Sequence, residues 1–461
     1  MIHSRINQLE ELEKSISRIN SSISNSFNLS SFDVSMLSFN RNSSDPLCML
    51  MAQFVGKQRE GRTSSDSRPS SSFLFMYSQP LLTSKGKELT QQIDYFEEEA
   101  TVQKVLKEGK CQVNYIHCPG TLQKLHYWLT QGVEILHFSG HGVERKEENY
   151  LVFETEEGLS KNVSGKMLSE LLTAKQVSLK LVFVASCHSE SAGRMFAEAG
   201  VSHVICVRDE YQIMDEACLE FVRLFYLTCI NNKTTICQAF EFAKKQLVLS
   251  EKFTKHECEK FILLAGHEGA CKQHFENHNQ TSAFTNVNPR PYYSQHILSK
   301  VENYIPRCRQ IHEVVSHIHK KKRFITIVGQ PGLGKSTLAR ELVRYLLIRN
   351  FFEDGVVYLE IGRCETMAKV FEVLDLEFFE TPQMKLNKTP GENTHRLAKE
   401  LGDRRVLIVL DNCQAIMASE DRDNFKRLSE IIMKSCPNVH FVFTNRHSIS
   451  RQIDYCSEVL L

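Results

Sequence analysis

The stretch Phe324-Ile-Thr-Ile-Val-Gly-Gln-Pro-Gly-Leu-Gly-Lys-Ser-Thr337 decides the fold of the C-terminal part of this chain. Its apolar beginning predicts a buried strand, the turn that follows matches the pattern G-x4-G-K-S, and a helical run comes next. Glycines let successive backbone N–H groups turn towards phosphate oxygens, and the helix N-terminus adds the positive end of its dipole. The spacing therefore predicts a strand–loop–helix unit that holds the phosphates of a nucleotide.

The predicted nucleotide site extends over this loop and two later strand ends. Lys335 is expected to reach the β- and γ-phosphates of ADP or ATP, and the Ser336 hydroxyl to complete the shell of a Mg²⁺ ion. Asp411, after an apolar strand, is expected to hold Mg²⁺ or its water, and Arg446 to sense the γ-phosphate. A helix N-cap and a surface charge are the alternatives for these two. The whole set is Gly329, Gln330, Pro331, Gly332, Leu333, Gly334, Lys335, Ser336, Thr337, Asp411 and Arg446.

Upstream, short apolar strands alternate with amphipathic helices. Such alternation predicts a mostly parallel sheet whose two faces are both covered by helices. The strands are expected at 73–77, 112–117, 134–138, 150–153, 179–185, 203–207 and 261–264, and the helices at 94–106, 121–129, 165–172, 192–199, 214–230 and 235–249. Further strands are expected at 324–328, 356–361, 406–410 and 440–444, after a helix at 305–319. In such sheets functional residues gather at the carboxyl ends of strands.

Two of these strand ends carry a histidine and a cysteine. The run 134–142 ends in Ser-Gly-His141-Gly142, and the run 179–187 ends on Cys187, which is 46 residues after His141. That separation is close to the roughly 50 residues between base and nucleophile in caspases. A thiol of ordinary pKa is mostly protonated at pH 7, so an adjacent imidazole is needed to make the thiolate and to protonate the leaving amine. The backbone N–H groups of Gly142 and Cys187 could form an oxyanion hole.

Structural roles compete with this interpretation. His141 could be a turn histidine packed beneath a loop, and Cys187 a buried thiol, which is a common role for cysteine. His137 lies inside the strand and is expected to be a core or orienting group. His188, directly after the cysteine, is expected to point away and to be a poorer base than His141.

Both motifs resemble the CHAT branch of the caspase-hemoglobinase fold, which has a histidine in an HxSGHG turn and a cysteine at a strand end. The likeness covers about residues 73–266 and includes Ser78-Gln-Pro80, the acidic helix with Glu97, Glu98 and Glu99, and the strand that begins at His203. This resemblance implies cysteine endopeptidase activity on a protein substrate.

The C-terminal part resembles the NB-ARC group of STAND NTPases. The likeness rests on the loop 329–337, the run Val406–Cys413, the Thr-Asn-Arg run 444–446 and the closing residues 458–461. It implies ADP or ATP binding and assembly into homo-oligomers. Two departures are Pro306, where the family's entry motif has glycine, and Asn412, where many ATPases have a second acid. Without that acid, we expect slow turnover that suits a switch.

The domain organisation expected from these patterns has four parts. Residues 1–72 are expected to be a mostly disordered leader, 73–267 the CHAT domain, 268–304 a polar linker, and 305–461 a partial NB-ARC domain that lacks the family's further subdomains. The group His267-x3-Cys271-x2-His274-x3-His278 has spacings that could hold zinc, but a single cysteine in a polar segment favours linker residues.

Composition limits the classes of partner and the cellular compartment that can be expected. Lys and Arg number 56 against 55 Asp and Glu, for a net charge of +1, so no overall field favours nucleic acid or an anionic membrane. No apolar run is long enough to cross a bilayer, and the N-terminus lacks the apolar core of a signal peptide. The 15 cysteines show no paired framework, which favours reduced thiols in the cytoplasm.

These observations together predict a nucleotide-regulated cysteine endopeptidase that acts in signalling, cell death or innate defence. A catalytically inactive CHAT-like adaptor that binds ADP or ATP is the alternative. A plain ATPase is a third and weaker one.

Overall fold

The computed structural model describes residues 71–89, 95–109, 111, 113–145, 148–173, 178–230, 234–265, 284–286, 304–378, 389–448 and 456–461. The predicted disorder of the leader and the possible zinc group from His267 to His278 lie outside these residues, apart from Ser71 and Ser72. None of the helices in the described ranges combines the length and the apolar character that crossing a bilayer requires.

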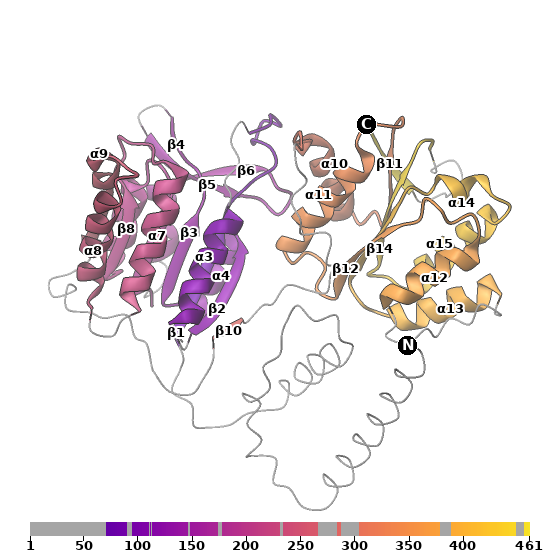
Figure 1. Ribbon diagram of the computed structural model, residues 1–461, viewed down its shortest axis with the longest axis horizontal. Helices are drawn as coiled ribbons and strands as arrows, with labels where there is room; N and C mark the ends of the chain where they lie inside the picture. The colour runs from indigo at the N-terminus through magenta and orange to yellow at the C-terminus, as the bar shows by residue number, and fades with distance from the viewer. Residues whose placement is uncertain are drawn as a thin grey trace, which may run out of the picture. The chain divides into compact units, whose positions relative to one another are not determined.

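A seven-stranded sheet with the order β10-β2-β1-β3-β7-β8-β9 forms the centre of the N-terminal α/β domain (Figure 1). Its strands are β1 (Ser71–Tyr77), β2 (Val113–Pro119), β3 (Ile135–Ser139), β7 (Leu181–Ala185), β8 (His203–Val207), β9 (Phe261–Ala265) and β10 (Thr285–Asn286). Every neighbouring pair is parallel except β8 and β9. The predicted mostly parallel sheet is confirmed.

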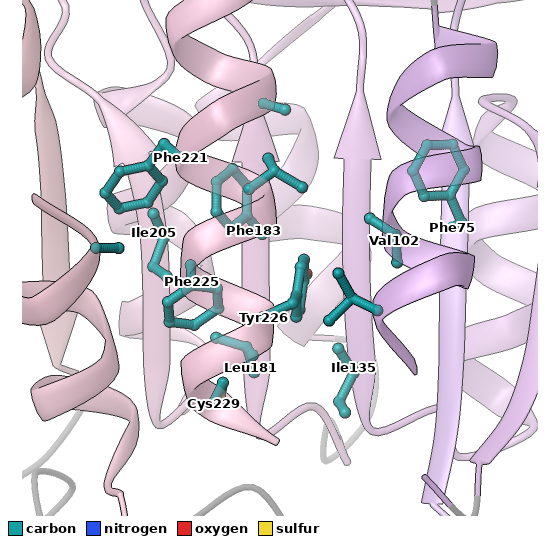
Figure 2. Packing of buried hydrophobic residues seen from close by; sticks show 14 of the residues in the cluster. Phe75, Val102, Ile135, Leu181, Phe183, Ile205, Phe221, Phe225, Tyr226 and Cys229 are labelled. Atoms are coloured by element: carbon teal, nitrogen blue, oxygen red, sulfur yellow. The ribbon is translucent and has the colours of Figure 1, made fainter. Parts of the chain in front are cut away.

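Helices cover both faces of this sheet because its strands are apolar on both sides. Phe73, Phe75 and Tyr77 pack with α3 (Tyr95–Glu108), α7 (Asp215–Cys229) and α8 (Ile236–Leu249), and Figure 2 shows part of this cluster. Leu74 and Met76 face the other way. They pack with a second group of helices, which is α4 (Leu122–Thr130), α5 (Gly165–Thr173) and α6 (Glu190–Glu198). The short helix α9 (Lys255–Glu259) precedes β9.

Three strands of this N-terminal domain were not predicted from the sequence. The single strand expected at 150–153 is the middle of an antiparallel sheet of β4 (Gly142–Arg145), β5 (Glu148–Glu154) and β6 (Ser160–Ser164). Strand β10 lies in the stretch assigned to a linker, where Phe284 packs against the Tyr115 ring at a centroid distance of 5.3 Å. Polar or very short strands such as these give too little hydrophobic alternation to be recognised.

The C-terminal domain has a second, five-stranded parallel sheet with the order β12-β13-β14-β11-β15. Its strands are β11 (Phe324–Val328), β12 (Gly355–Glu360), β13 (Val406–Asp411), β14 (His440–Asn445) and β15 (Cys456–Leu460). The helices are α10 (Cys308–His319), α11 (Lys335–Ile348), α12 (Met367–Phe378), α13 (Pro390–Leu401), α14 (Gln414–Ala418) and α15 (Arg422–Ser435). This is the predicted P-loop α/β arrangement.

A buried polar network crosses the core of the N-terminal domain. His137 on β3 is fully buried between the rings of Phe75 and Phe183, at centroid distances of 4.9 and 5.0 Å. Its Nε2 lies 2.9 Å from Oε1 of Glu98 on α3, and its Nδ1 lies 3.0 Å from the Tyr226 hydroxyl. The other Glu98 oxygen accepts a hydrogen bond from Ser139. His137 is therefore a core residue that links three elements.

Replacing Glu98 by alanine should destabilise the fold by about 1–3 kcal/mol, because His137 and Ser139 would lose an acceptor that water cannot easily replace. Chemical denaturation of the whole chain measures the change. Glu97→Ala is the matched control, since Glu97 is exposed on the same helix and its removal should change stability by less than about 0.5 kcal/mol. Equal effects of the two substitutions would contradict a structural role for the network.

Candidate active site and nucleotide site

His141 and Cys187 follow two strands that are hydrogen-bonded neighbours. Strands β3 and β7 are parallel, and Ser139 is opposite Ala185 in their register. Each of the two candidate residues lies two positions beyond this pair, and Gly140 N–H still donates to the Ala185 carbonyl at 3.3 Å. The two strand ends therefore meet at the same edge of the sheet.

Gly142 lies directly against the backbone of Cys187. A Cβ atom built on Gly142 would be 1.6 Å from the Cys187 carbonyl oxygen and 2.9 Å from the Ser186 hydroxyl oxygen. Only glycine allows this close approach of two backbones. The turn after β3 is thus pressed onto the predicted nucleophile, which is where an oxyanion donor would have to be. The role of the Gly142 N–H as an oxyanion donor stays a prediction.

Cys187 is partly buried, and its surroundings disfavour the thiolate. Burial raises the pKa of the Cys187 thiol, while the Ile213 N–H, 3.4 Å from the sulfur, opposes this effect. Asp215 raises the same pKa further, and Lys260 lowers it. The net direction is upwards. A raised pKa favours the protonated thiol over the thiolate at neutral pH.

The backbone of His141 is held by the small antiparallel sheet. Its carbonyl accepts the Val152 N–H at 2.8 Å, so β5 positions the turn that carries the imidazole. The ring of His188 is engaged differently, since its Nδ1 lies 2.5 Å from the Asp209 carbonyl oxygen. His188 also has a φ of 49°, in the left-handed region that side chains rarely adopt. The sequence predicted strand β5 but not its contact with His141.

The phosphate-binding loop has the geometry that its glycines predict. Gly332 and Gly334 have φ angles of 81° and 80°, and apart from their chain neighbours no atom of the described residues lies within 4 Å of a Cβ built on either. Helix α11 begins at Lys335, whose Nζ donates to the carbonyls of Gly329 and Gln330 at 2.8 and 3.0 Å. Burial and the nearby Arg446 lower the pKa of Lys335, and Asp411 opposes them. An anion placed beside Lys335 would reverse this shift.

Asp411 is a buried carboxylate at the end of β13. Its Oδ2 accepts the Tyr358 hydroxyl at 2.7 Å, and its Oδ1 accepts the hydroxyl of Thr444. The N-cap of α14 is Cys413, so the alternative role of Asp411 as a helix cap is wrong. Arg446 is exposed beyond β14, and Ser336 is exposed at the start of α11. Serine and carboxylate oxygens suit Mg²⁺, so the residues present fit a magnesium–nucleotide complex.

The CHAT domain family profile matches residues 29–287, which is more than half of the chain. The chain belongs to the CHAT domain family. The NB-ARC domain profile matches residues 307–447, directly after it. The chain is therefore a CHAT domain followed by an NB-ARC domain, as the resemblance implied. The CHAT match begins inside the predicted leader and ends inside the predicted linker, and the exact domain boundaries stay a prediction.

Among curated proteins, the chain is similar to the apoptotic protease-activating factor 1 of Danio rerio, with 38% identity over 61 residues. The match covers 13% of this chain and 5% of that protein, so the chain spans a small part of that relative's length.

Solved structures are similar only in part. The Aeropyrum pernix Orc1 protein in complex with DNA has 18% identity over 36% of this chain and 46% of its own, with a TM-score of 0.30. A Walker-type ATPase of Pyrococcus abyssi has 15% identity over 37% of this chain and 55% of its own, with a TM-score of 0.26. Superpositions this loose support no functional argument.

Gly142→Ala should disrupt the contact between the two strand ends of the CHAT domain. The new Cβ would overlap a backbone oxygen, so the turn must move, at a cost of about 1–3 kcal/mol. Thermal or chemical unfolding measures the loss, and mass spectrometry of alkylated peptides reports altered Cys187 accessibility. Gly391→Ala is the control, because among the described residues nothing outside its own helix lies within 4 Å of its built Cβ at the start of α13. A Gly142→Ala protein as stable as the control would refute the predicted close contact.

Lys335→Met should weaken ADP and ATP binding to the NB-ARC domain by roughly 10- to 100-fold, because a charged donor to the phosphates is removed without loss of side-chain length. Calorimetric titration with the magnesium nucleotides measures this. Lys434→Met is the matched control, since Lys434 is exposed on α15 away from the loop in sequence. Unchanged affinity in the Lys335 variant would exclude this loop as the nucleotide site.

Proposed function

We propose that this protein is a cysteine endopeptidase of CHAT type whose activity is controlled by ADP or ATP in its NB-ARC domain. One observation carries the proposal: the strand ends that lead to His141 and Cys187 are adjacent, and Gly142 lies against the Cys187 carbonyl. A nucleophile, a base and a backbone donor at one sheet edge are the parts that acyl transfer needs.

In the proposed reaction, His141 takes the proton of the Cys187 thiol, and the sulfur attacks the carbonyl carbon of a peptide bond. The oxyanion that forms accepts hydrogen bonds from the backbone N–H groups of Gly142 and Cys187. His141 then protonates the leaving amine as the C–N bond breaks, which leaves an acyl-enzyme. A water molecule, deprotonated by His141, releases the acid and restores the thiol.

The raised pKa of Cys187 supports a resting state of low reactivity. The NB-ARC domain would act as a switch between ADP and ATP forms, with Lys335 on the phosphates and Ser336 and Asp411 towards Mg²⁺. The similarity to an apoptotic protease-activating factor supports a role in signalling, cell death or innate defence, with assembly of several chains through the NB-ARC domain. A reducing compartment such as the cytoplasm would keep the thiol available.

A non-catalytic adaptor is the second candidate. The observation that favours it is the same shielded thiol, because a peptidase-like domain that only binds partners has no need for a thiolate. The two functions differ in whether any nucleotide state makes Cys187 reactive.

The alkylation rate of Cys187 separates the peptidase from the adaptor. Iodoacetamide is the reagent, peptide mass spectrometry is the readout, and the rate is measured with ADP and with a non-hydrolysable ATP analogue. In the resting form the rate should rise about tenfold per pH unit from pH 6 to 8, since the thiolate is a minor species below its raised pKa. In the activated form the rate at pH 7 should be higher, and His141→Ala should remove about 100-fold of it.

Two residues make this test specific. Cys456 is an internal control, because it is also partly buried and its pKa is raised to about 11. If Cys187 reacted no faster than Cys456 in every nucleotide state, and His141→Ala changed nothing, the adaptor would be the correct function. Cys187→Ala should also abolish cleavage of any protein substrate that the activated chain cuts.

A further inference from the structure

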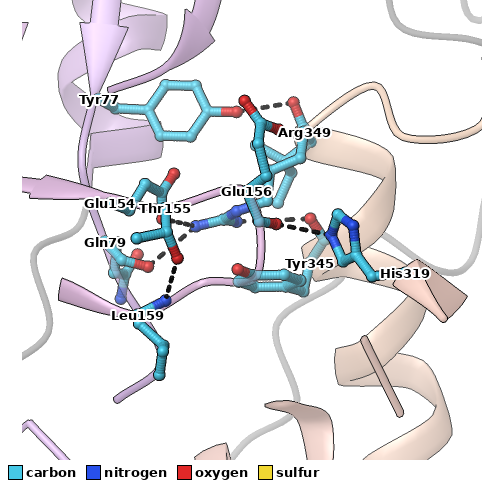
Figure 3. Close-up of polar contacts among 10 residues, drawn as sticks. Tyr77, Gln79, Glu154, Thr155, Glu156, Leu159, His319, Tyr345 and Arg349 are labelled. Carbon is cyan, nitrogen blue, oxygen red and sulfur yellow. Dashed lines mark hydrogen bonds and ion pairs between the residues drawn. The ribbon is translucent and has the colours of Figure 1, made fainter. Parts of the chain in front are cut away.

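The last turn of the NB-ARC helix α11 is packed into the CHAT domain. The side chain of Ile348 belongs to the same buried cluster as Tyr77 and Tyr95, and the Tyr77 hydroxyl donates to the Ile348 carbonyl at 2.7 Å (Figure 3). In return, Leu81 and Leu82 of the CHAT domain pack into the cluster formed by α10 and α11. The two domains therefore share buried apolar side chains at this contact.

An ion pair lies within this contact. Arg349, directly after α11, is 8% exposed and donates through one terminal nitrogen to Oε2 of Glu154 at 2.8 Å and to the Gln79 carbonyl at 2.9 Å. Its guanidinium lies 3.5 Å from the centre of the Tyr345 ring. Glu154 is only 2% exposed. A pair this well shielded from water holds its partners firmly, because separating them would leave a buried charge without compensation.

Glu154 connects this ion pair to the candidate active site. It is the last residue of β5, and Val152, two residues earlier on the same strand, holds the His141 carbonyl at 2.8 Å. Leu151 is paired with Gly142 across β4 and β5. One short strand thus contacts both the NB-ARC arginine and the turn that carries His141 and Gly142.

The opposite end of α11 is the phosphate-binding loop. The helix begins at Lys335 and continues without interruption to Ile348. At about 1.5 Å per residue, this one rigid element spans roughly 20 Å. A displacement of its N-terminus would therefore be transmitted to Arg349, because the helix is uninterrupted between them.

We propose that α11 couples nucleotide occupancy to the CHAT active site, with Arg349 as a positioning residue that the NB-ARC domain supplies to the turn of His141 and Gly142. The coupling acts within one chain, through the Arg349–Glu154 pair and β5, and needs no assembly. The expected effect on the reactivity of Cys187 rests on the proposed function. The coupling between α11 and β5 can be measured without any peptidase activity. Coupling of this kind requires that ADP and ATP favour different arrangements of α11.

The ion pair can be removed without leaving a buried charge. Arg349→Met keeps most of the side-chain length, Glu154→Gln keeps its shape, and the double variant removes both charges together. Each single substitution leaves one uncompensated group and can impair folding, so the double variant is the decisive protein. Arg404→Met is the matched control, because Arg404 forms an exposed ion pair with Glu400 on the NB-ARC domain at 3.0 Å.

Hydrogen–deuterium exchange of the full chain, diluted until it is monomeric, gives the first measurement. The Val152 amide should exchange at least about threefold differently between the ADP form and the form with a non-hydrolysable ATP analogue. This difference should vanish in the double variant and persist in the Arg404 variant, with ADP affinity within about twofold of wild type in both. The alkylation rate of Cys187 in the same samples should follow the same pattern.

Three results would decide against the coupling. One is an exchange rate at Val152 that does not depend on the nucleotide in the wild-type chain. Another is a nucleotide dependence that the double variant retains. The third is a dependence that appears only when the chains assemble, which would place the control in the oligomer. A Cys187 that never reacts, beside an intact exchange effect at Val152, would refute the peptidase function and leave the coupling standing.

Discussion

The parallel pairing of β3 with β7 is the constraint on which the rest of the CHAT domain depends. Because the two strands run in the same direction in a fixed register, whatever follows Ser139 must meet whatever follows Ala185. The pairing is fixed by side chains that are buried on both faces, so a shift by one residue would exchange the two buried clusters. The absence of a side chain on Gly142 then lets the two turns touch. The packing of the sheet thus brings together the backbones that carry His141 and Cys187.

Buried carboxyl groups are used in two ways in this molecule. Glu98 is enclosed with His137, Ser139 and the surrounding aromatic rings, so it fixes elements of one domain relative to one another. Glu154 is enclosed with an arginine from the other domain. Replacing either pair by apolar groups of equal volume would often cost little stability, so the value of such pairs lies in specifying which surfaces meet. In the second pair, the surfaces belong to the domain that would bind nucleotide and the domain that would cut peptides.

The sequence predicted most of the fold, because apolar strands and a complete phosphate-binding motif carry their information locally. Strands β1, β8 and β11 have the predicted bounds or differ only at their ends. Strands β4 and β6 were missed because they are short and partly exposed, and β10 because it has two residues in a polar stretch. Strand β15 was missed because only one of its five residues is buried. The roles of Tyr358 beside Asp411 and of Arg349 beside Glu154 could not be predicted. Their partners are 53 and 195 residues away, and no local pattern relates them.

In both candidate sites, the groups predicted to react are shielded: their charges have partners within the protein, or the group is buried. In the NB-ARC domain, Lys335 donates to carbonyls of its own loop and Asp411 accepts from two hydroxyls, so each charge has partners that a nucleotide and its metal could replace. In the CHAT domain, burial raises the pKa of Cys187 above its usual value, which favours the protonated thiol. In the proposed mechanism His141 removes this proton, so a change in the position of His141 would change the reactivity of the thiol. Helix α11 extends from the phosphate-binding loop to the contact with the CHAT domain, and in the proposed coupling phosphate binding would act on the thiol through this helix.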